Sequence, residues 1–495
     1  MTPEPALEVF RAGFERGEAQ VVSTRLIDDL ETPVSAFLKV GAGRPYSFLF
    51  ESVEGGAWRG RYSIIALEPD LVWRCRGDRA EVSEGDDLAR SRFRPLAEDA
   101  LASLRALVAA SRIVLPPGLP PMAAGVFGAL GYDMVRLMER LPDAPPDPLD
   151  LPDAVLARPS VVAVFDSVFG EIILVTPVRP GALTADAAYA AAQGRLAAVA
   201  EKLAAPAPRP APAPAESPAL RSEVTRDAFC ELVETTRAYI RDGDIFQAVP
   251  SHRFSGAFSQ PPFAFYRALR RLNPSPYLFF LDFGGFQLAG SSPEILVRLR
   301  DGKITIRPLA GTRRRGATPE EDAALERELL ADPKERAEHL MLVDLGRNDV
   351  GRNAALGSVR VTDSFKVERY SHVMHIVSNV EGAAPAEVDP VDVLLNALPA
   401  GTLSGAPKIR AMEIINGLEL HKRGLTYAGA VGYISCEGQV DTAIVLRSAL
   451  IKDGMIHTQA GAGVVADSDP QAEYEETLHK SEAVRRAAEE AWRFA

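Results

Sequence analysis

The chain has 495 residues, enough for two or three domains with large buried cores. Hydrophobic residues make up 47% and charged residues 25% of the sequence, as in ordinary globular proteins, which excludes a disordered or fibrous chain. The formal net charge of −12 makes nucleic acids and anionic membranes poor candidate partners.

The N-terminal part, residues 1–205, mixes short apolar strands with turns that contain Gly or Pro. Strands are expected at 46–51, 71–76, 161–165 and 172–178. Alanine and leucine at helical spacing predict a helix over 187–204. The proline-rich stretch that follows, 206–219, predicts an extended spacer and marks the clearest domain boundary.

The C-terminal part, residues 220–495, again combines helices with strands in hairpin-like spacing. Thr225 can cap a first helix. Further helices are predicted at 319–331, 333–348, 407–416 and 470–492, and strands at 287–288, 295–299, 430–435 and 443–450. Strands and helices do not alternate as regular βαβ units. The sequence therefore predicts an α+β fold with large, mostly antiparallel sheets packed with helices.

Two of these helices carry glutamates three residues apart, which share a helix face. The pairs are Glu335 with Glu338 and Glu473 with Glu476. If the two faces meet, four carboxylates converge and need a cation, and hard oxygen ligands suit Mg²⁺. The alternative is that both pairs lie on ordinary solvated faces.

Two histidines lie in the apolar, β-branched segment SHVMHIVSNV. His372 and His375 are three residues apart, so on a strand they face opposite sides and do not share a metal. One of them can line a cavity and transfer protons near neutral pH. A structural histidine with satisfied hydrogen bonds is the competing interpretation.

Three glycine-containing loops, 308–316, 401–410 and 459–465, could bind anions through backbone N–H groups. Thr402 or Ser404 can cap the helix after the second loop. Arg447 lies in the apolar strand segment AIVLRSALI and needs a fixed anionic partner there. Together these features favour a substrate with two carboxylates.

The C-terminal half resembles the chorismate-utilising enzymes. The matching motifs are GDIFQAVPS (243–251), IRPLAGTRRRG (306–316), AEHLMLVDLGRND (337–349), HVMHIVSNVEG (372–382), GTLSGAPKIRAM (401–412) and QAGAGVVADSDPQAEYEET (459–477). The N-terminal half is similar to the companion domain of anthranilate synthase component I, in PYSFLFESVEGG (45–56) and RGRYSII (59–65). The resemblance implies an N-terminal regulatory part and a C-terminal catalytic part. It also implies formation of anthranilate and pyruvate from chorismate and ammonia.

The resemblance also implies roles for individual residues. Glu338 and Glu476 match direct Mg²⁺ ligands, and Glu335 and Glu473 match an outer pair. His375 matches the proton-transfer residue. The remaining positions match contacts with the substrate: Gly311, Thr312, Thr402, Tyr433, Arg447, Gly461, Ala462 and Gly463.

Two positions discriminate within the resembling family. Isochorismate and salicylate synthases carry a water-activating Lys where this chain has Gln247, and many aminodeoxychorismate synthases carry a nucleophilic Lys where it has Ala310. The absence of both lysines favours ammonia as nucleophile and amination next to the ring carboxylate. Aminodeoxychorismate synthase component I stays an alternative, because Ala310 is not decisive by itself.

Cysteine chemistry points to a separate ammonia source. Cys75, Cys230 and Cys436 lie far apart, which is typical of the reducing cytoplasm and predicts no disulfide framework. None of them looks like the activated nucleophile that a glutaminase needs. We therefore expect a glutamine amidotransferase subunit as partner. No apolar run approaches the roughly 20 residues of a membrane span.

The same resemblance implies feedback inhibition by tryptophan. Glu51 and Ser52 match one wall of the inhibitor site, with Phe50 in place of a Leu. The second wall is the segment Asn273, Pro274, Ser275, Pro276 and Tyr277. Glu51 can pair with an ammonium group, and Tyr277 offers a ring to an indole. Two other classes are alternatives: a non-catalytic amino-acid-binding regulatory protein, and a metal hydrolase using His372 and His375.

Overall fold

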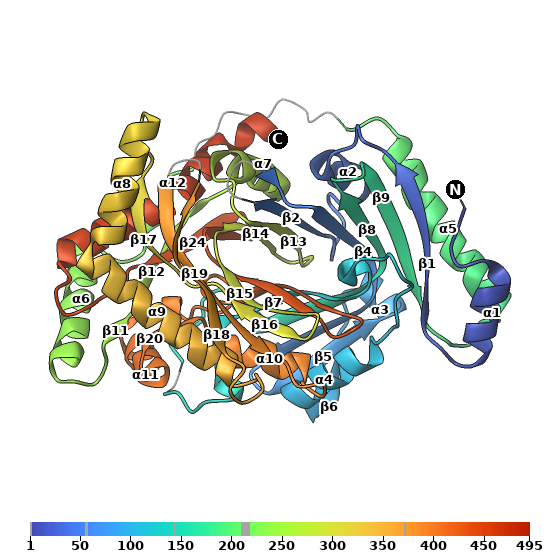
Figure 1. Ribbon diagram of the computed structural model, residues 1–495. Coiled ribbons are helices and arrows are strands. Elements are labelled where there is room, and N and C mark those ends of the chain that lie inside the picture. The colour runs from blue at the N-terminus through green and yellow to red at the C-terminus, as the bar shows by residue number, and fades with distance from the viewer. Residues whose placement is uncertain (1, 55–57, 143, 209–217, 371–372) are drawn as a thin grey trace.

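The computed structural model describes residues 2–54, 58–142, 144–208, 218–370 and 373–495. All its strand pairs are antiparallel, and most belong to one continuous network that divides into two layers with helices on the outside (Figure 1). The α+β fold with large antiparallel sheets is therefore confirmed. None of the helices in these ranges is long and apolar enough to cross a bilayer.

One layer begins and ends with strands from different halves of the chain. Its order is β1 (Gln20–Ile27), β9 (Glu171–Val178), β8 (Ala154–Asp166), β4 (Tyr62–Arg76), β2 (Phe48–Glu54), β13 (Tyr277–Asp282), β14 (Gln287–Ser292), β23 (Ser448–Lys452), β24 (Met455–Gly461), β12 (Ser251–Ala257) and β10 (Arg221–Ser222). The short strand β3 (Trp58–Arg59) pairs with the end of β2.

The other layer leads to the region where the glutamate helices lie. Its order is β6 (Arg94–Asp99), β5 (Arg79–Glu84), β4, β8, β7 (Gly125–Leu130), β21 (Ala430–Ser435), β22 (Val440–Ile444), β15 (Ile295–Arg300), β16 (Lys303–Ile306) and β19 (Val373–Ala383). β17 (Leu309–Arg314) continues along the β16 edge of β19, and β18 (Arg360–Arg369) pairs with the other edge.

The long strands β4 and β8 belong to both layers. Their pairing shifts register between Pro69 and Leu71, where proline cannot donate to the ladder. The two halves of the chain are also interlaced, because β2 pairs with β13 and β7 pairs with β21. Residues 1–205 and 220–495 thus share both layers. Most of the 206–219 spacer lies outside the described residues.

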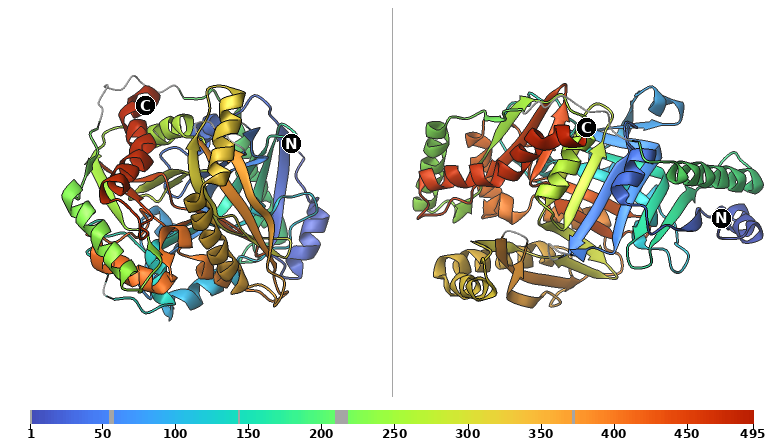
Figure 2. Two further views of the ribbon diagram at one scale, coloured as in Figure 1. Left: turned by 60° about the vertical axis from the view of Figure 1, so that its left-hand side comes forward. Right: turned by 90° about the horizontal axis from the view of Figure 1, so that it is seen from above.

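Apolar side chains fill three zones. Between the layers lie residues such as Phe48, Phe127 and Leu288. Helices α1 (Leu7–Glu15), α2 (Pro33–Val40), α5 (Ala185–Ala204), α7 (Pro262–Leu272) and α12 (Pro470–Glu490) bury a second zone against the first layer (Figure 2). The helices α4 (Ala100–Ala110) and α10 (Pro390–Ala397) bury a third zone against the other layer.

Helices begin at the predicted residues 319, 333 and 470, whereas those predicted from 187 and 407 begin at Ala185 and Lys408. Thr225 accepts a hydrogen bond from the Ala228 amide at the start of α6 (Arg226–Arg241). Asp332 caps α9 (Pro333–Gly351), and Asp469 caps α12. The remaining helices are α3 (Asp86–Ala89), α8 (Pro319–Ala331) and α11 (Lys408–Leu418).

Two local predictions are wrong. Residues 443–450 do not form one strand, because β22 ends at Ile444 and β23 begins at Ser448. Arg447 lies in the break with φ of +49°, a left-handed conformation that ends a strand. Helix α11 begins after Pro407 without a side-chain cap, so neither Thr402 nor Ser404 caps it.

Candidate active site

The predicted substrate loops and glutamate helices lie at one end of the two layers. Helix α9 packs against β17 and β19, and α12 packs against β24 (Figure 1). At Gly311 the β17 strand bulges with φ of +66°, and a Cβ there would lie 3.2 Å from Glu335 Oε2. Glycine is therefore needed for the glutamate helix to approach the strand so closely.

The carboxylates of α9 and α12 act on one another. Burial raises the pKa of Glu338, and the negative charges of Glu335 and Glu476 raise it further. Burial also raises the pKa of Glu473, whose Oε2 atom is buried without a hydrogen-bond partner. The glutamates of the two helices therefore lie close enough for their charges to interact. The Glu476 side chain is still 46% exposed to solvent.

Two cations accompany the glutamates. Lys480 Nζ lies 2.5 Å from Glu476 Oε1 and donates to Gly461 O at 3.1 Å. Burial would raise the pKa of Glu476, but Lys480 outweighs it and the pKa is lowered. Arg447 donates to the carbonyl of Lys480, and burial lowers the pKa of its guanidinium. The carboxylates thus face a strip of positive charge.

The donor chemistry of this group fits Mg²⁺. Its side chains supply carboxylate oxygens, and the unpartnered Glu473 Oε2 is free to accept. In the described part of the chain, no three or more His, Cys, Asp or Glu side chains already form a metal-binding group. Glu338 and Glu476 must therefore move closer before they can share an ion. Arg313 Nη1 holds Glu335 Oε1 at 3.0 Å, which suits an outer rather than a direct position.

His375 lies on β19 opposite Thr312 of β17. Its Nδ1 atom is 3.0 Å from Gly311 O and 3.1 Å from Thr312 Oγ1. Because a carbonyl oxygen can only accept, Nδ1 carries the proton and Nε2 is left as an acceptor. Burial lowers the pKa of His375 to about 4, so the imidazole is neutral at pH 7. His372 lies outside the described residues.

Glu294, which the sequence analysis did not select, lies beside Thr402. Its side chain is buried and accepts a hydrogen bond from Thr402 Oγ1 at 3.2 Å. Burial raises the pKa of Glu294 to about 8. The available signal was a single glutamate in the apolar context SSPEILV. A buried carboxyl that is protonated at neutral pH is a candidate general acid.

The glycine loop at the end of β24 meets a tyrosine, but a different one from that predicted. A Cβ on Gly461 would lie 2.9 Å from the Tyr427 hydroxyl. Tyr433 instead lies between the layers, where its ring is 5.4 Å from Phe127 and its hydroxyl accepts from Arg300 at 3.3 Å. The structure does not bring Tyr433 to the substrate loops. Side chains along β21 alternate between its two faces, and Tyr433 is on the face that points into the space between the layers.

The other positions of the glycine loop lie against residues 247–250. Ala462 N donates to Pro250 O at 3.1 Å, so this amide is already bonded. A Cβ on Gly463 would lie 2.8 Å from Gln247 Nε2, and the buried Gln247 Oε1 has no partner. Ala310 is buried in β17. No lysine occupies either discriminating position.

The segments expected to bind tryptophan lie side by side. Tyr277 of β13 pairs directly with Ser52 of β2, so the two predicted walls meet despite the long sequence separation. Tyr277 is held by Arg298, whose Nη2 donates to its hydroxyl at 3.1 Å, and burial raises the pKa of Tyr277 to about 12. Asn273, Pro274, Ser275 and Pro276 form the turn between α7 and β13.

Glu51 does not face a ligand in this arrangement. Both of its oxygens are taken by Arg270, at 2.7 and 2.8 Å, and Tyr266 donates a further hydrogen bond. Arg270 therefore takes the place expected for a ligand's ammonium group, because both carboxylate oxygens of Glu51 are already bonded to it.

Comparison with known proteins identifies the class of enzyme to which this fold and site belong. The family described as chorismate binding enzyme matches residues 48–486. This range includes both glutamate helices, β17, β19 and the glycine loop. The isochorismate synthase MenF from Escherichia coli shares the fold, with 20% identity and a TM-score of 0.71 over 98% of this chain and 99% of the other.

Relatives of higher sequence identity show which family within this class the chain belongs to. The chain is 55% identical to anthranilate synthase component 1 of Cereibacter sphaeroides, over 99% of this chain and 98% of the relative. It is 47% identical to the Pseudomonas aeruginosa protein of that name, with 98% of both chains covered. The crystal structure of anthranilate synthase component I from Streptococcus pneumoniae is 39% identical, with a TM-score of 0.76 and coverage of 86% and 92%. The chain therefore belongs to the anthranilate synthase component 1 family, as its motifs predicted.

Proposed function

We propose that this chain is a lyase that converts chorismate and ammonia to anthranilate and pyruvate. The observation that carries the proposal is the electrostatic interaction of Glu338 with Glu476, which come from two helices, beside Lys480 and Arg447. Carboxylates on one side and cations on the other suit a metal-bound carboxylate at one end of the substrate and a free carboxylate at the other. The relatives' names support the same reaction.

Mg²⁺ is the proposed cofactor. Glu338 and Glu476 would hold it directly, with Glu335 and Glu473 as an outer pair. The bound ion would polarise the ring carboxylate of chorismate and so favour attack on the ring. The raised pKa of Glu338 supports this role, because a carboxyl pressed against other carboxylates gains most from a divalent cation.

The second carboxylate of chorismate would bind where positive charge and backbone meet. Arg447, Lys480 and the loop at Gly461–Gly463 surround this position, and Tyr427 closes it. Gly311, Thr312 and Thr402 would contact the ring end of the substrate. The bonded Lys480 fixes the distance between the two carboxylate subsites, because it touches Glu476 and Gly461 at once.

Two different residues would handle the protons. Glu294, protonated below a pKa of about 8, would donate a proton to the C4 hydroxyl as it leaves during attack of ammonia at C2. His375 Nε2 would then accept the C2 proton, which expels pyruvate and makes the ring aromatic. The resemblance gave proton transfer to His375, whereas this assignment divides it between Glu294 and His375. The geometry leaves His375 no proton to give from Nε2.

A partner and an inhibitor complete the proposal. Ammonia would come from a glutamine amidotransferase subunit, since burial raises the pKa of Cys75 and of Cys436 to about 12, which leaves both thiols poor nucleophiles. Tryptophan would bind between β2 and β13 at Ser52 and Tyr277. We expect Ser52→Phe to fill this space, so the variant should stay active while tryptophan inhibits it far less than the wild type.

The decisive experiment incubates the purified chain with chorismate, Mg²⁺ and ammonium and identifies the product. We expect anthranilate, and we expect glutamine to replace ammonium only after an amidotransferase subunit is added. Glu338→Gln and Glu476→Gln should abolish turnover and weaken Mg²⁺ binding measured by calorimetry. Glu475→Gln, on an exposed position of the same helix, is the matched control. Aminodeoxychorismate as product would favour the alternative function.

A further inference from the structure

The segment between α11 and β21, residues 421–424, is clamped by the N-terminal half of the chain. Gly424 N donates to Asp133 Oδ2 at 3.0 Å, and Gly424 O accepts from Tyr132 N at 2.9 Å. The backbone amide of Lys422 donates to Pro146 O at 3.0 Å. The segment is therefore attached to the other half of the chain through its backbone at two residues.

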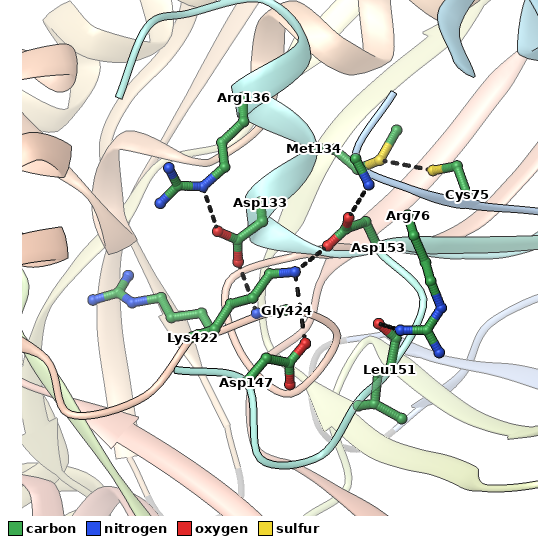
Figure 3. A network of polar contacts seen from close by, with 12 residues as sticks. Cys75, Arg76, Asp133, Met134, Arg136, Asp147, Leu151, Asp153, Lys422 and Gly424 are labelled. Carbon is green, nitrogen blue, oxygen red and sulfur yellow. Dashed lines mark hydrogen bonds and ion pairs between the residues drawn. The ribbon is translucent and has the colours of Figure 1, made fainter. Parts of the chain in front are cut away.

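The Lys422 side chain adds a charged contact to this clamp, as Figure 3 shows. Its Nζ atom lies 2.6 Å from Asp153 Oδ1 and 3.6 Å from Asp147 Oδ2. Burial would lower the pKa of Lys422, but Asp153 outweighs burial and the pKa is raised, so the ammonium stays charged. Asp153 is itself fixed, because its Oδ2 accepts from Gly77 N at 2.7 Å.

The next residue, Arg423, points into the protein and is 2% exposed. Its guanidinium binds Glu419 through Nε at 2.9 Å and Nη2 at 2.5 Å. Nη1 donates to Leu403 O at 2.7 Å, and Nη2 also donates to Val249 O at 2.6 Å. The rings of Tyr132 and Tyr427 lie 4.7 and 5.2 Å from the guanidinium carbon.

Three of these partners, Leu403, Val249 and Tyr427, lead to the candidate active site. Leu403 directly follows Thr402, which bonds Glu294. Val249 N donates to Ser404 O at 3.0 Å, so the same guanidinium holds both sides of the Thr402 loop. Tyr427 reaches Gly461 in the glycine loop.

We propose that Arg423 is a positioning residue, and that the Lys422 clamp lets the N-terminal half set the geometry of the Thr402 loop and Tyr427. Its guanidinium is occupied by Glu419, two backbone carbonyls and two rings, so it does not contact substrate. Loosening the clamp lets the guanidinium shift, and Thr402 and Tyr427 shift with it. The kinetic part of this inference rests on the proposed function, whereas the placement of the loop does not.

The test compares two lysines that both bridge the halves of the chain. Lys422→Met removes the contacts with Asp153 and Asp147. Lys452→Met is the matched control, because Lys452 Nζ donates to Leu149 O at 2.8 Å at the end of β23 away from the glycine loop. Amide hydrogen exchange of residues 400–406 and 425–430 reports the loop directly. Steady-state kinetics with chorismate and ammonium report its effect.

We expect faster exchange in those two segments for Lys422→Met alone, with kcat lowered about 10- to 10²-fold, since a small misplacement of binding groups is that costly. Arg423→Lys keeps the positive charge opposite Glu419 but loses the guanidinium that bonds several partners at once. It should give the same faster exchange in residues 400–406 and 425–430. Unchanged exchange at 400–406 in both variants, or an equal increase over the whole chain, would overturn the inference. If the wild type makes no anthranilate, the proposed function fails, while the exchange result still decides the positioning role.

Discussion

Two buried glutamates, one in each half of the chain, have opposite surroundings. Glu51 in β2 is bound by both nitrogens of an Arg270 fork at 2.7 and 2.8 Å and also accepts from Tyr266. Glu294 has no cation within bonding distance and accepts one hydrogen bond from Thr402 at 3.2 Å. Both side chains are less than 10% exposed.

The difference in bonding partners distinguishes a structural role for Glu51 from a chemical role for Glu294. A bidentate guanidinium gives a buried carboxylate fixed partners and ties β2 to α7. Glu294 forms no ion pair among the described residues, and burial outweighs the charge of Lys480 and raises the pKa of Glu294 to about 8. A buried carboxyl without an ion pair is therefore a better candidate for chemistry than a buried carboxylate that is paired.

The largest effect on the rate should come from removing the carboxyl of Glu294, which has no ion pair. We expect Glu294→Gln to lower kcat by about 10²- to 10⁴-fold, the usual range for a lost general acid. At pH values above 8, the midpoint of thermal unfolding of the variant should equal or exceed that of the wild type. The reason is that the amide carries no charge that must be buried. Kinetics and calorimetry on one preparation measure both. Full activity of Glu294→Gln would contradict the role of Glu294 as general acid.

His375→Ala should lower the rate by about 10²-fold without unfolding the protein, because only the Nε2 acceptor is lost from the reaction. Circular dichroism checks the fold, and turnover of chorismate with ammonium measures the loss. His372→Ala serves as the control. If that variant is the inactive one, the assignment of His375 is wrong.

Glu51→Gln should show the opposite behaviour to Glu294→Gln. We expect a loss of about 2 kcal/mol in the free energy of unfolding, since Arg270 is left without its counter-charge but is partly exposed. Ammonium-dependent kcat should change little. Glu18→Gln, which breaks the exposed Arg16–Glu18 pair, is the matched control and should cost far less. Equal denaturant midpoints for both variants would contradict the scaffold role.

The smallest effect concerns pH. Glu294 donates only while protonated, so the rate at a constant concentration of NH₃ should fall as pH rises through about 8. His375, with its pKa lowered to about 4, stays neutral over this range and adds no change. A pH series from 7 to 9.5 measures the fall, which should reach roughly tenfold one unit above the pKa. A flat profile would mean that another group supplies the proton.

Local signals in the sequence predicted much of this structure. Pro333 and Pro470 stand at the predicted starts of α9 and α12, and the i,i+3 spacing placed each glutamate pair on one face. Motif resemblance brought β2 and β13 to one predicted site. The failures depend on contacts that no local pattern contains. Glu51 and Glu294 differ through the side chains around them, Arg270 and Tyr266 for Glu51 and Thr402 for Glu294. Tyr427 and Tyr433 both lie in the segment GLTYAGAVGYIS, and the sequence does not show which of them reaches the glycine loop.

The interlaced strands also govern how the chain can be made. As the N-terminal half leaves the ribosome, β2 and β7 each have one edge whose partner has not yet been synthesised. β2 waits for Tyr277–Asp282, and β7 waits for Ala430–Ser435. Open strand edges with apolar faces pair with other chains when they are left exposed. A nascent or truncated N-terminal half is therefore the species of this protein most in need of protection from aggregation.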